Sequence, residues 1–136
     1  MRPRYERPRD LTNEQRVAAR MKERGIELRK LPMSYRLDFA MFRDGKLRGF
    51  AETKARNNRF RSYPTLMISL GKVMAARQLA EISDTRSVLL VKFLDEIVWC
   101  DFASSFEVAM GGRWDRGDDD DVEPVAHYPI ETFKIV

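Results

Sequence analysis

Residues 37–54 read LDFAMFRDGKLRGFAETK. Apolar and polar side chains alternate on both sides of Asp44-Gly45, which is the pattern of two antiparallel strands joined by a tight turn. We therefore expect strands over residues 35–43 and 46–55. This hairpin decides the fold, because the remaining elements are expected to pack around it.

Three charged residues lie within these otherwise apolar strands: Asp38 in the first, and Glu52 and Lys54 in the second. Side chains alternate along a strand, so Glu52 and Lys54 project from the same face. A two-residue turn would send Asp38 and Glu52 to opposite faces. A three-residue loop, Arg43-Asp44-Gly45, would pair Asp38 with Phe50 and return Glu52 to the face of Asp38. We predict the three-residue loop.

The rest of the chain predicts two helices and further strands around this hairpin. The connection between the second hairpin strand and the next strand is long enough for a parallel crossover. We therefore expect an α/β (α+β) fold, in which a central mixed β-sheet is flanked by helices. The expected elements are a helix at 12–24 capped by Thr12, a strand at 26–31, a helix at 65–83, strands at 86–94 and 97–102, a long loop at 103–123, and an edge strand within 127–136.

The length of 136 residues suits one globular domain, which we place at residues 11–136 after a flexible basic arm at residues 1–10. No apolar run approaches the roughly 18 residues that a membrane-spanning helix needs, and the first residues do not resemble a signal peptide. An intracellular, cytoplasmic protein without membrane contact is expected. The single cysteine, Cys100, excludes an intramolecular disulfide and a thiolate zinc site.

The net charge of +4 hides an asymmetry. Residues 1–61 carry 18 Lys/Arg against 8 Asp/Glu, a net charge of +10, whereas the remainder carries 7 against 13, a net charge of −6. A basic half of this kind indicates a surface that faces a polyanion such as DNA. The alternative is that the excess belongs largely to an unstructured basic arm.

Two carboxylates and a lysine on one sheet face suit the hydrolysis of a phosphodiester bond. Asp38 and Glu52 can bind Mg²⁺, with Mn²⁺ as a substitute, because both ions prefer oxygen ligands. The backbone carbonyl of Thr53 is a further candidate ligand. Lys54 can orient or help to deprotonate the attacking water and offset the negative charge of the transition state.

The pattern Leu37-Asp38, followed after thirteen residues by Glu52-Thr53-Lys54, resembles the PD-(D/E)xK (restriction-endonuclease-like) nuclease superfamily. The resemblance covers about residues 11–102 and implies an αβββαβ core. It also implies that Asp38 and Glu52 are metal ligands and that Lys54 is catalytic. An acid of the first helix is a further ligand in many members, and Glu14 is the candidate here. The chain departs from the pattern where Leu37 replaces the proline, and it lacks a clear Gln-x-x-x-Tyr element.

Five more residues are candidates for contacts with phosphates near the cleaved bond. Three of them follow Lys54 in a polar loop, and two lie three residues apart in the second expected helix. The string Ser-x-x-Lys in that helix does not indicate a covalent hydrolase, because the companion motifs are absent. The candidates are Arg56, Arg59, Arg61, Ser69 and Lys72.

The leading hypothesis is a metal-dependent deoxyribonuclease, an endonuclease of a phage type, that acts on branched or single-stranded DNA. A homodimer would suit the cutting of two strands. The first alternative is a catalytically inactive nuclease-like protein that binds DNA or serves in assembly. The second is an unrelated α+β interaction module, in which the spacing of the acids is a coincidence and Asp38 and Glu52 lie on opposite sheet faces. For the three residues alone, the alternative to a functional site is a surface salt-bridge cluster on a half-solvated sheet.

Overall fold

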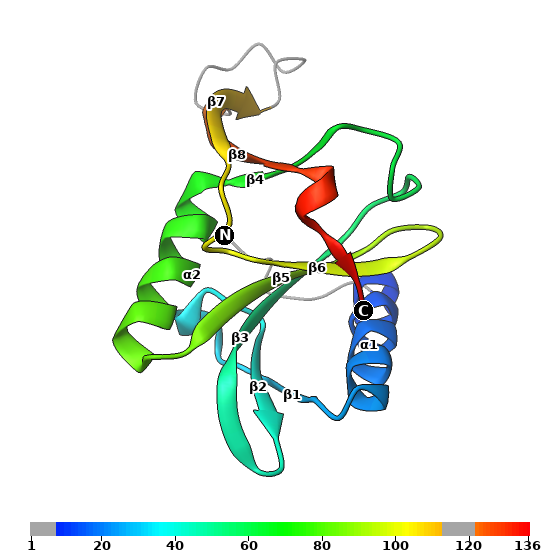
Figure 1. Cartoon of the computed structure of the whole chain (residues 1–136), viewed down its shortest axis with the longest axis vertical. Coiled ribbons are helices and arrows are strands. Elements are labelled where there is room, and N and C mark those ends of the chain that lie inside the picture. Colours follow the sequence, from blue (N-terminus) through cyan, green and yellow to red (C-terminus); the bar gives the residue numbers. More distant parts are fainter. Residues whose placement is uncertain (1–7, 113–121) are drawn as a thin grey trace.

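The computed structural model describes residues 8–112 and 122–136. A mixed six-stranded sheet forms the centre of the fold, with α1 and α2 on its opposite sides (Figure 1). A smaller three-stranded sheet lies beside it. The elements are α1 (Pro8–Glu23), β1 (Glu27–Lys30), β2 (Phe39–Arg43), β3 (Lys46–Ala55), β4 (Thr65–Ser69), α2 (Leu70–Ser83), β5 (Arg86–Lys92), β6 (Ile97–Asp101), β7 (Glu107–Gly112), β8 (Val122–Pro129) and β9 (Lys134–Ile135), with short 3₁₀ helices at Met33–Tyr35 and Ile130–Thr132.

The strand order of the central sheet is β1-β2-β3-β5-β6-β9. All neighbours in it are antiparallel except β3 and β5, which run parallel. The chain reaches β5 from β3 through β4 and α2, as expected for a crossover. The central mixed sheet between helices confirms the predicted fold class, and β9 confirms the predicted edge strand near the end of the chain.

Two apolar clusters hold the helices to the sheet. The cluster on the α1 side contains Val17 of α1 with Met41 and Leu90 of the sheet. The cluster on the α2 side contains Val73 of α2 with Phe50 of β3. Alternate residues of β2, β3 and β5 belong to the α1-side cluster and to the α2-side cluster. Both faces of the sheet are therefore covered, and only a few positions remain for charged side chains.

The smaller sheet, in the order β4-β8-β7, was not predicted. Residues 65–69 were expected to begin the second helix, but they form β4, and the helix begins at Leu70. The expected loop over 103–123 contains β7; residues 113–121 of that loop lie outside the described residues. The apolar residues Leu66 and Ile68 alternate with Met67 along β4, a period that strand pairing with β8 satisfies.

The start of α1 also differs from expectation. The helix begins at Pro8 and not after a cap at Thr12, so part of the predicted basic arm is helical. Proline is tolerated in a first helical turn because the N–H group it lacks has no intrahelical partner there. Residues 1–7 of the predicted arm lie outside the described residues. No helix in the described ranges is long and apolar enough to span a membrane.

Asp38 and Glu52 lie on the same face of the hairpin, as predicted, but the register that brings them together differs from the predicted one. Arg43 pairs with Lys46, so the turn contains two residues, Asp44 and Gly45, both with positive φ. The predicted three-residue loop and the pairing of Asp38 with Phe50 are therefore wrong. A bulge in β3 supplies the missing shift, because Phe42 pairs with Leu47 while Met41 pairs with Gly49.

Gly49 makes this bulge sterically feasible. A Cβ atom at this position would lie 2.3 Å from the backbone oxygen of Arg86 in β5 and 3.0 Å from the Met41 side chain. The bulged strand therefore approaches β5 more closely than any larger residue permits. Beyond the bulge Phe39 pairs with Ala51, and extending the ladder by one residue places Asp38 opposite Glu52.

Candidate active site

Asp38 and Glu52 form a pair of buried carboxylates between the central sheet and α2. Asp38 is 6% exposed and Glu52 is 3% exposed. Asp38 directly precedes β2, whereas the sequence placed it inside a strand that began at residue 35. It still occupies a ladder position, because its N–H donates to Ala51 and its carbonyl accepts from Leu31.

Thr53 holds the Asp38 carboxylate in place. Its backbone N–H donates to Asp38 Oδ2 at 2.8 Å, and its hydroxyl donates to the same oxygen at 2.9 Å. These contacts come from the residue between Glu52 and Lys54, so β3 fixes the position of its own partner across the hairpin. The structure thus gives the Thr53 side chain a positioning contact that the sequence analysis did not propose.

Two lysines approach Glu52 from different elements. The Nζ atoms of Lys54 in β3 and Lys72 in α2 each lie 3.5 Å from Glu52 Oε2. Lys72 also donates to the carbonyl of Arg36, which has a positive φ of 63° two residues before Asp38. Lys72 therefore links the helix, the buried acid and the segment that leads into Asp38.

From the sequence, Lys72 was expected at a phosphate and not beside Glu52. A signal for the second placement was present, because Lys72 lies four residues before Ala76, a fully buried position of α2. A lysine on the inward stripe of a helix opposite a buried strand carboxylate is the pattern that could have identified this contact.

The electrostatics of Glu52 follow from its burial. Desolvation raises the pKa of Glu52 from 4.5 to about 7. Repulsion by Asp38 and a hydrogen bond with the Asp38 side chain act in the same direction, whereas Lys54 and Lys72 lower the pKa. Two lysines thus compensate only part of the cost of holding a charge beside Asp38.

The pair meets the requirements of a divalent cation. Glu52 Oε1 is buried and has no hydrogen-bond partner among the described residues, although buried polar atoms of proteins are usually paired. Carboxylate oxygens suit Mg²⁺ and Mn²⁺, and Mg²⁺ is commonly held by one or two carboxylates together with waters and substrate phosphates. No group of three or more His, Cys, Asp or Glu that could hold a metal occurs in the described ranges, so the protein would supply two carboxylates here.

Glu14 is not brought into such a group. Its carboxylate lies 2.9 Å from Lys30 Nζ in β1. The Lys30 ammonium is 5.1 Å from the ring of Phe39, and Phe39 belongs to the cluster on the α1 side of the sheet. Glu52 faces the α2 side, where Lys72 contacts it.

The other predicted phosphate contacts lie in three different settings. Arg56 donates to the backbone carbonyls of Ala55 and Met67, at 3.1 and 3.2 Å, and burial lowers its pKa, so it ties the end of β3 to β4. Arg59 and Arg61 are exposed in the loop after β3; Arg59 lies 3.7 Å from Asp95, and Arg61 lies against the ring of Phe60. The remaining candidate, Ser69, stands at the start of α2 and makes no side-chain capping bond.

The protein has a mixed sheet with one helix on each face, and a pair of buried acids lies at two neighbouring strands of that sheet, Asp38 directly before β2 and Glu52 in β3, with Lys54 two residues after Glu52. This combination defines the restriction-endonuclease-like class of proteins. The match to a family model then identifies the family itself. The chain belongs to the family described as "Phage putative PDDEXK endonuclease", whose model matches residues 1–136.

The fold is similar to that of a solved structure. The Hjc protein of Archaeoglobus fulgidus, a Holliday junction resolvase from an archaeal hyperthermophile, matches with a TM-score of 0.55 at 11% sequence identity. The match covers 68% of this chain and 76% of the Hjc chain. No curated protein matches the chain. The likeness to Hjc supports the fold, and the family match supports the class of enzyme.

Proposed function

We propose that this protein is a divalent-metal-dependent endonuclease that hydrolyses DNA through Asp38, Glu52 and Lys54. The observation that carries the proposal is the buried pair of carboxylates, with one oxygen of Glu52 left without a hydrogen bond. A stable fold gains nothing from a buried carboxylate oxygen without a hydrogen-bond partner, whereas a bound cation would use it.

Each residue has a distinct part in this scheme. Asp38 and Glu52 would hold the ion, with the carbonyl of Thr53 as an additional candidate ligand. When bound, a divalent cation polarises the scissile phosphate and lowers the pKa of an attacking water. Lys54 Nζ, at 3.5 Å from Glu52, stands where it can orient that water and stabilise the negative charge that develops on the phosphate.

Lys72 contributes a second positive charge, which the sequence analysis did not place at this carboxylate. Its ammonium lies as close to Glu52 as that of Lys54, and its side chain is less exposed, 20% against 35%. Because it also bonds to the Arg36 carbonyl, we assign it a positioning part, holding Glu52 relative to the segment before Asp38.

The substrate we propose is DNA with single-stranded or branched character. The basic loop after β3, with Arg59 and Arg61, and Ser69 at the N-terminus of α2 offer further phosphate contacts. The similarity in fold to a Holliday junction resolvase makes a four-way junction the first branched substrate to test.

The test is cleavage of plasmid, single-stranded and four-way-junction DNA with Mg²⁺ or Mn²⁺. The wild type should cut at least one of these, and Lys54→Ala and Glu52→Gln should cut it at least about a hundredfold more slowly, since charge-stabilising groups of this kind contribute on that order. Binding without cleavage in any divalent metal would favour the inactive nuclease-like alternative. Equal rates for the wild type and Lys54→Ala would refute the assignment.

A further inference from the structure

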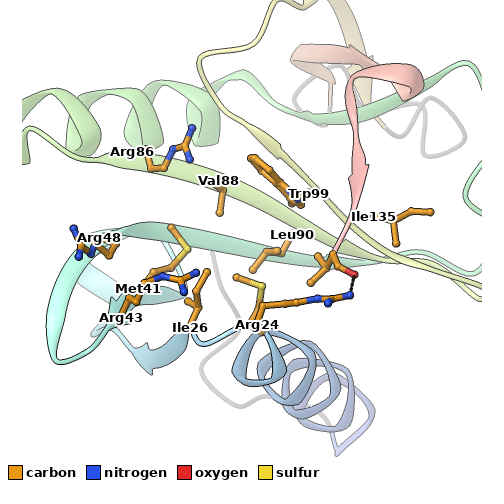
Figure 2. Close-up of a pocket in the computed structure, with 12 residues that line it drawn as sticks. Arg24, Ile26, Met41, Arg43, Arg48, Arg86, Val88, Leu90, Trp99 and Ile135 are labelled. Carbon is orange, nitrogen blue, oxygen red and sulfur yellow. Dashed lines mark hydrogen bonds between the residues drawn. The ribbon is translucent and has the colours of Figure 1, made fainter.

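A cavity of about 600 Å³ lies on the face of the central sheet opposite the carboxylate pair (Figure 2). Its floor is apolar, with Met41 from β2 and Val88 and Leu90 from β5. These side chains belong to the cluster on the α1 side, whereas Glu52 faces α2. The volume falls within the range of about 300 to 1,000 Å³ that is typical of small-molecule sites.

Four arginines line this cavity, and no acidic residue does so among those described. Figure 2 shows Arg43 and Arg48 beside Met41, and Arg86 and Arg24 at other parts of the rim. Such an arrangement joins an apolar surface to a concentration of guanidinium groups, which bind phosphate and carboxylate oxygens in a bidentate manner.

Two of these arginines already have partners, and two form no ion pair within the described residues. Arg86 lies 3.3 Å from Asp101, and Arg24 donates to the backbone oxygen of Val136, the last residue of the sequence, at 3.2 Å. Arg43 and Arg48 are exposed at the mouth, so their guanidinium groups are available for an anionic ligand.

The bulge in β3 gives Arg48 its place at the cavity. Regular alternation would send Arg48 to the α2 side, the face of Phe50, but a bulge turns the extra residue toward the face of its cross-strand neighbour, here Met41. The same irregularity therefore aligns Asp38 with Glu52 on one face and adds a guanidinium to the cavity on the other.

Trp99 completes the cavity with an aromatic surface. Its indole lines the wall above Leu90 in Figure 2, and the cations of Arg86 and Lys134 lie 5.8 and 5.7 Å from its ring. An aromatic ring beside an apolar floor can stack on a flat nucleobase, while the rim arginines can bind the phosphate of the same nucleotide.

We propose that this cavity binds a nucleotide, with its base against Trp99 and the apolar floor and its phosphate at Arg43 and Arg48. The same chemistry fits a free nucleotide and the unpaired terminal nucleotide of a DNA strand. The proposal goes beyond the cleavage reaction, since the cavity and the carboxylate pair lie on opposite faces of the sheet.

The test is calorimetric titration of the full chain with deoxyadenosine monophosphate and with 5′-phosphorylated hexadeoxyadenylate, in EDTA. Binding should weaken about tenfold or more in Arg48→Glu and in Arg43→Glu, as expected for losing a charged hydrogen bond. Lys22→Glu is the matched control, because it makes the same charge change at an exposed position of α1 that does not line the cavity.

A higher affinity for the hexamer than for the mononucleotide would identify the end of a DNA strand as the ligand, and a higher affinity for the mononucleotide would identify a free nucleotide. The proposal is overturned if neither ligand binds at millimolar concentration, if Lys22→Glu weakens binding as much as Arg48→Glu, or if inorganic phosphate competes as well as the nucleotide. The assay contains no divalent metal and measures binding alone, so a negative result leaves the proposed cleavage reaction standing.

Discussion

Replacing Glu52 by glutamine would measure how much stability the protein gives up to keep a buried carboxylate. The pKa of Glu52 is raised from 4.5 to about 7 by burial and by Asp38. Between these values the folded protein retains a proton that the unfolded chain releases, so wild-type stability falls as the pH rises from 4.5 to 7 and is level above that. At about 1.36 kcal/mol per pH unit, the loss amounts to about 3 kcal/mol.

Glutamine has nearly the same shape and does not ionise. Glu52→Gln should therefore unfold like the wild type near pH 4.5 and be more stable by up to about 3 kcal/mol near pH 8.5. The measurement is urea denaturation across this range in EDTA, with free energies of unfolding from linear extrapolation. An excess of Mn²⁺ should narrow the difference at high pH, because an ion that binds the folded state stabilises the wild type.

The matched control is Glu107→Gln, an exposed position at the start of β7. This change leaves the buried pair intact and should unfold like the wild type throughout the range. A difference between Glu52→Gln and the wild type that stays constant with pH, or a variant that is less stable at high pH, would refute the reasoning that Glu52 is held in a costly charged state.

Three further predictions concern the site and its support. Lys72→Ala should shift the part of the pH profile where the DNA cleavage rate rises with pH to higher pH, because Lys72 lowers the pKa of Glu52; an unshifted profile would contradict this. Gly49→Ala should cost about 1 to 3 kcal/mol in urea denaturation through its clash with β5, whereas Gly71→Ala, where an added Cβ would meet only Ser69 Oγ at 3.5 Å, should be neutral or stabilising. Burial raises the pKa of Cys100 to about 12, so its thiol should react with a disulfide reagent only at the rate of global unfolding.

The elements that the sequence predicted are those with local signals. The hairpin, the crossover and the buried run of β5 are visible as alternation, turn residues and an unbroken apolar segment. The smaller sheet is held together by pairing between β4 and β8, which are far apart in the chain. Residues 65–69 carry apolar side chains that fit either a helix or a strand, and only the distant partner decides between the two.

The site shows the same division. Alternation places Glu52 and Lys54 on one face, and the requirement that Asp38 join them correctly implied a shift of register. The sequence assigned that shift to the turn, but a bulge beside Gly49 provides it, because Asp44 and Gly45 both adopt the left-handed conformation of a two-residue turn. A glycine within a strand is the local sign of a bulge, and it was available at this position.

A calorimetric titration with Mn²⁺ near pH 6.5, repeated in buffers of different ionisation enthalpy, tests most directly whether the buried acids form a metal site. If they do, the ion binds the wild type with release of protons, since Glu52 must give up the proton that it partly holds at this pH. Asp38→Asn should then abolish this binding. An ion that binds without proton release, or equally well to Asp38→Asn, would contradict the account.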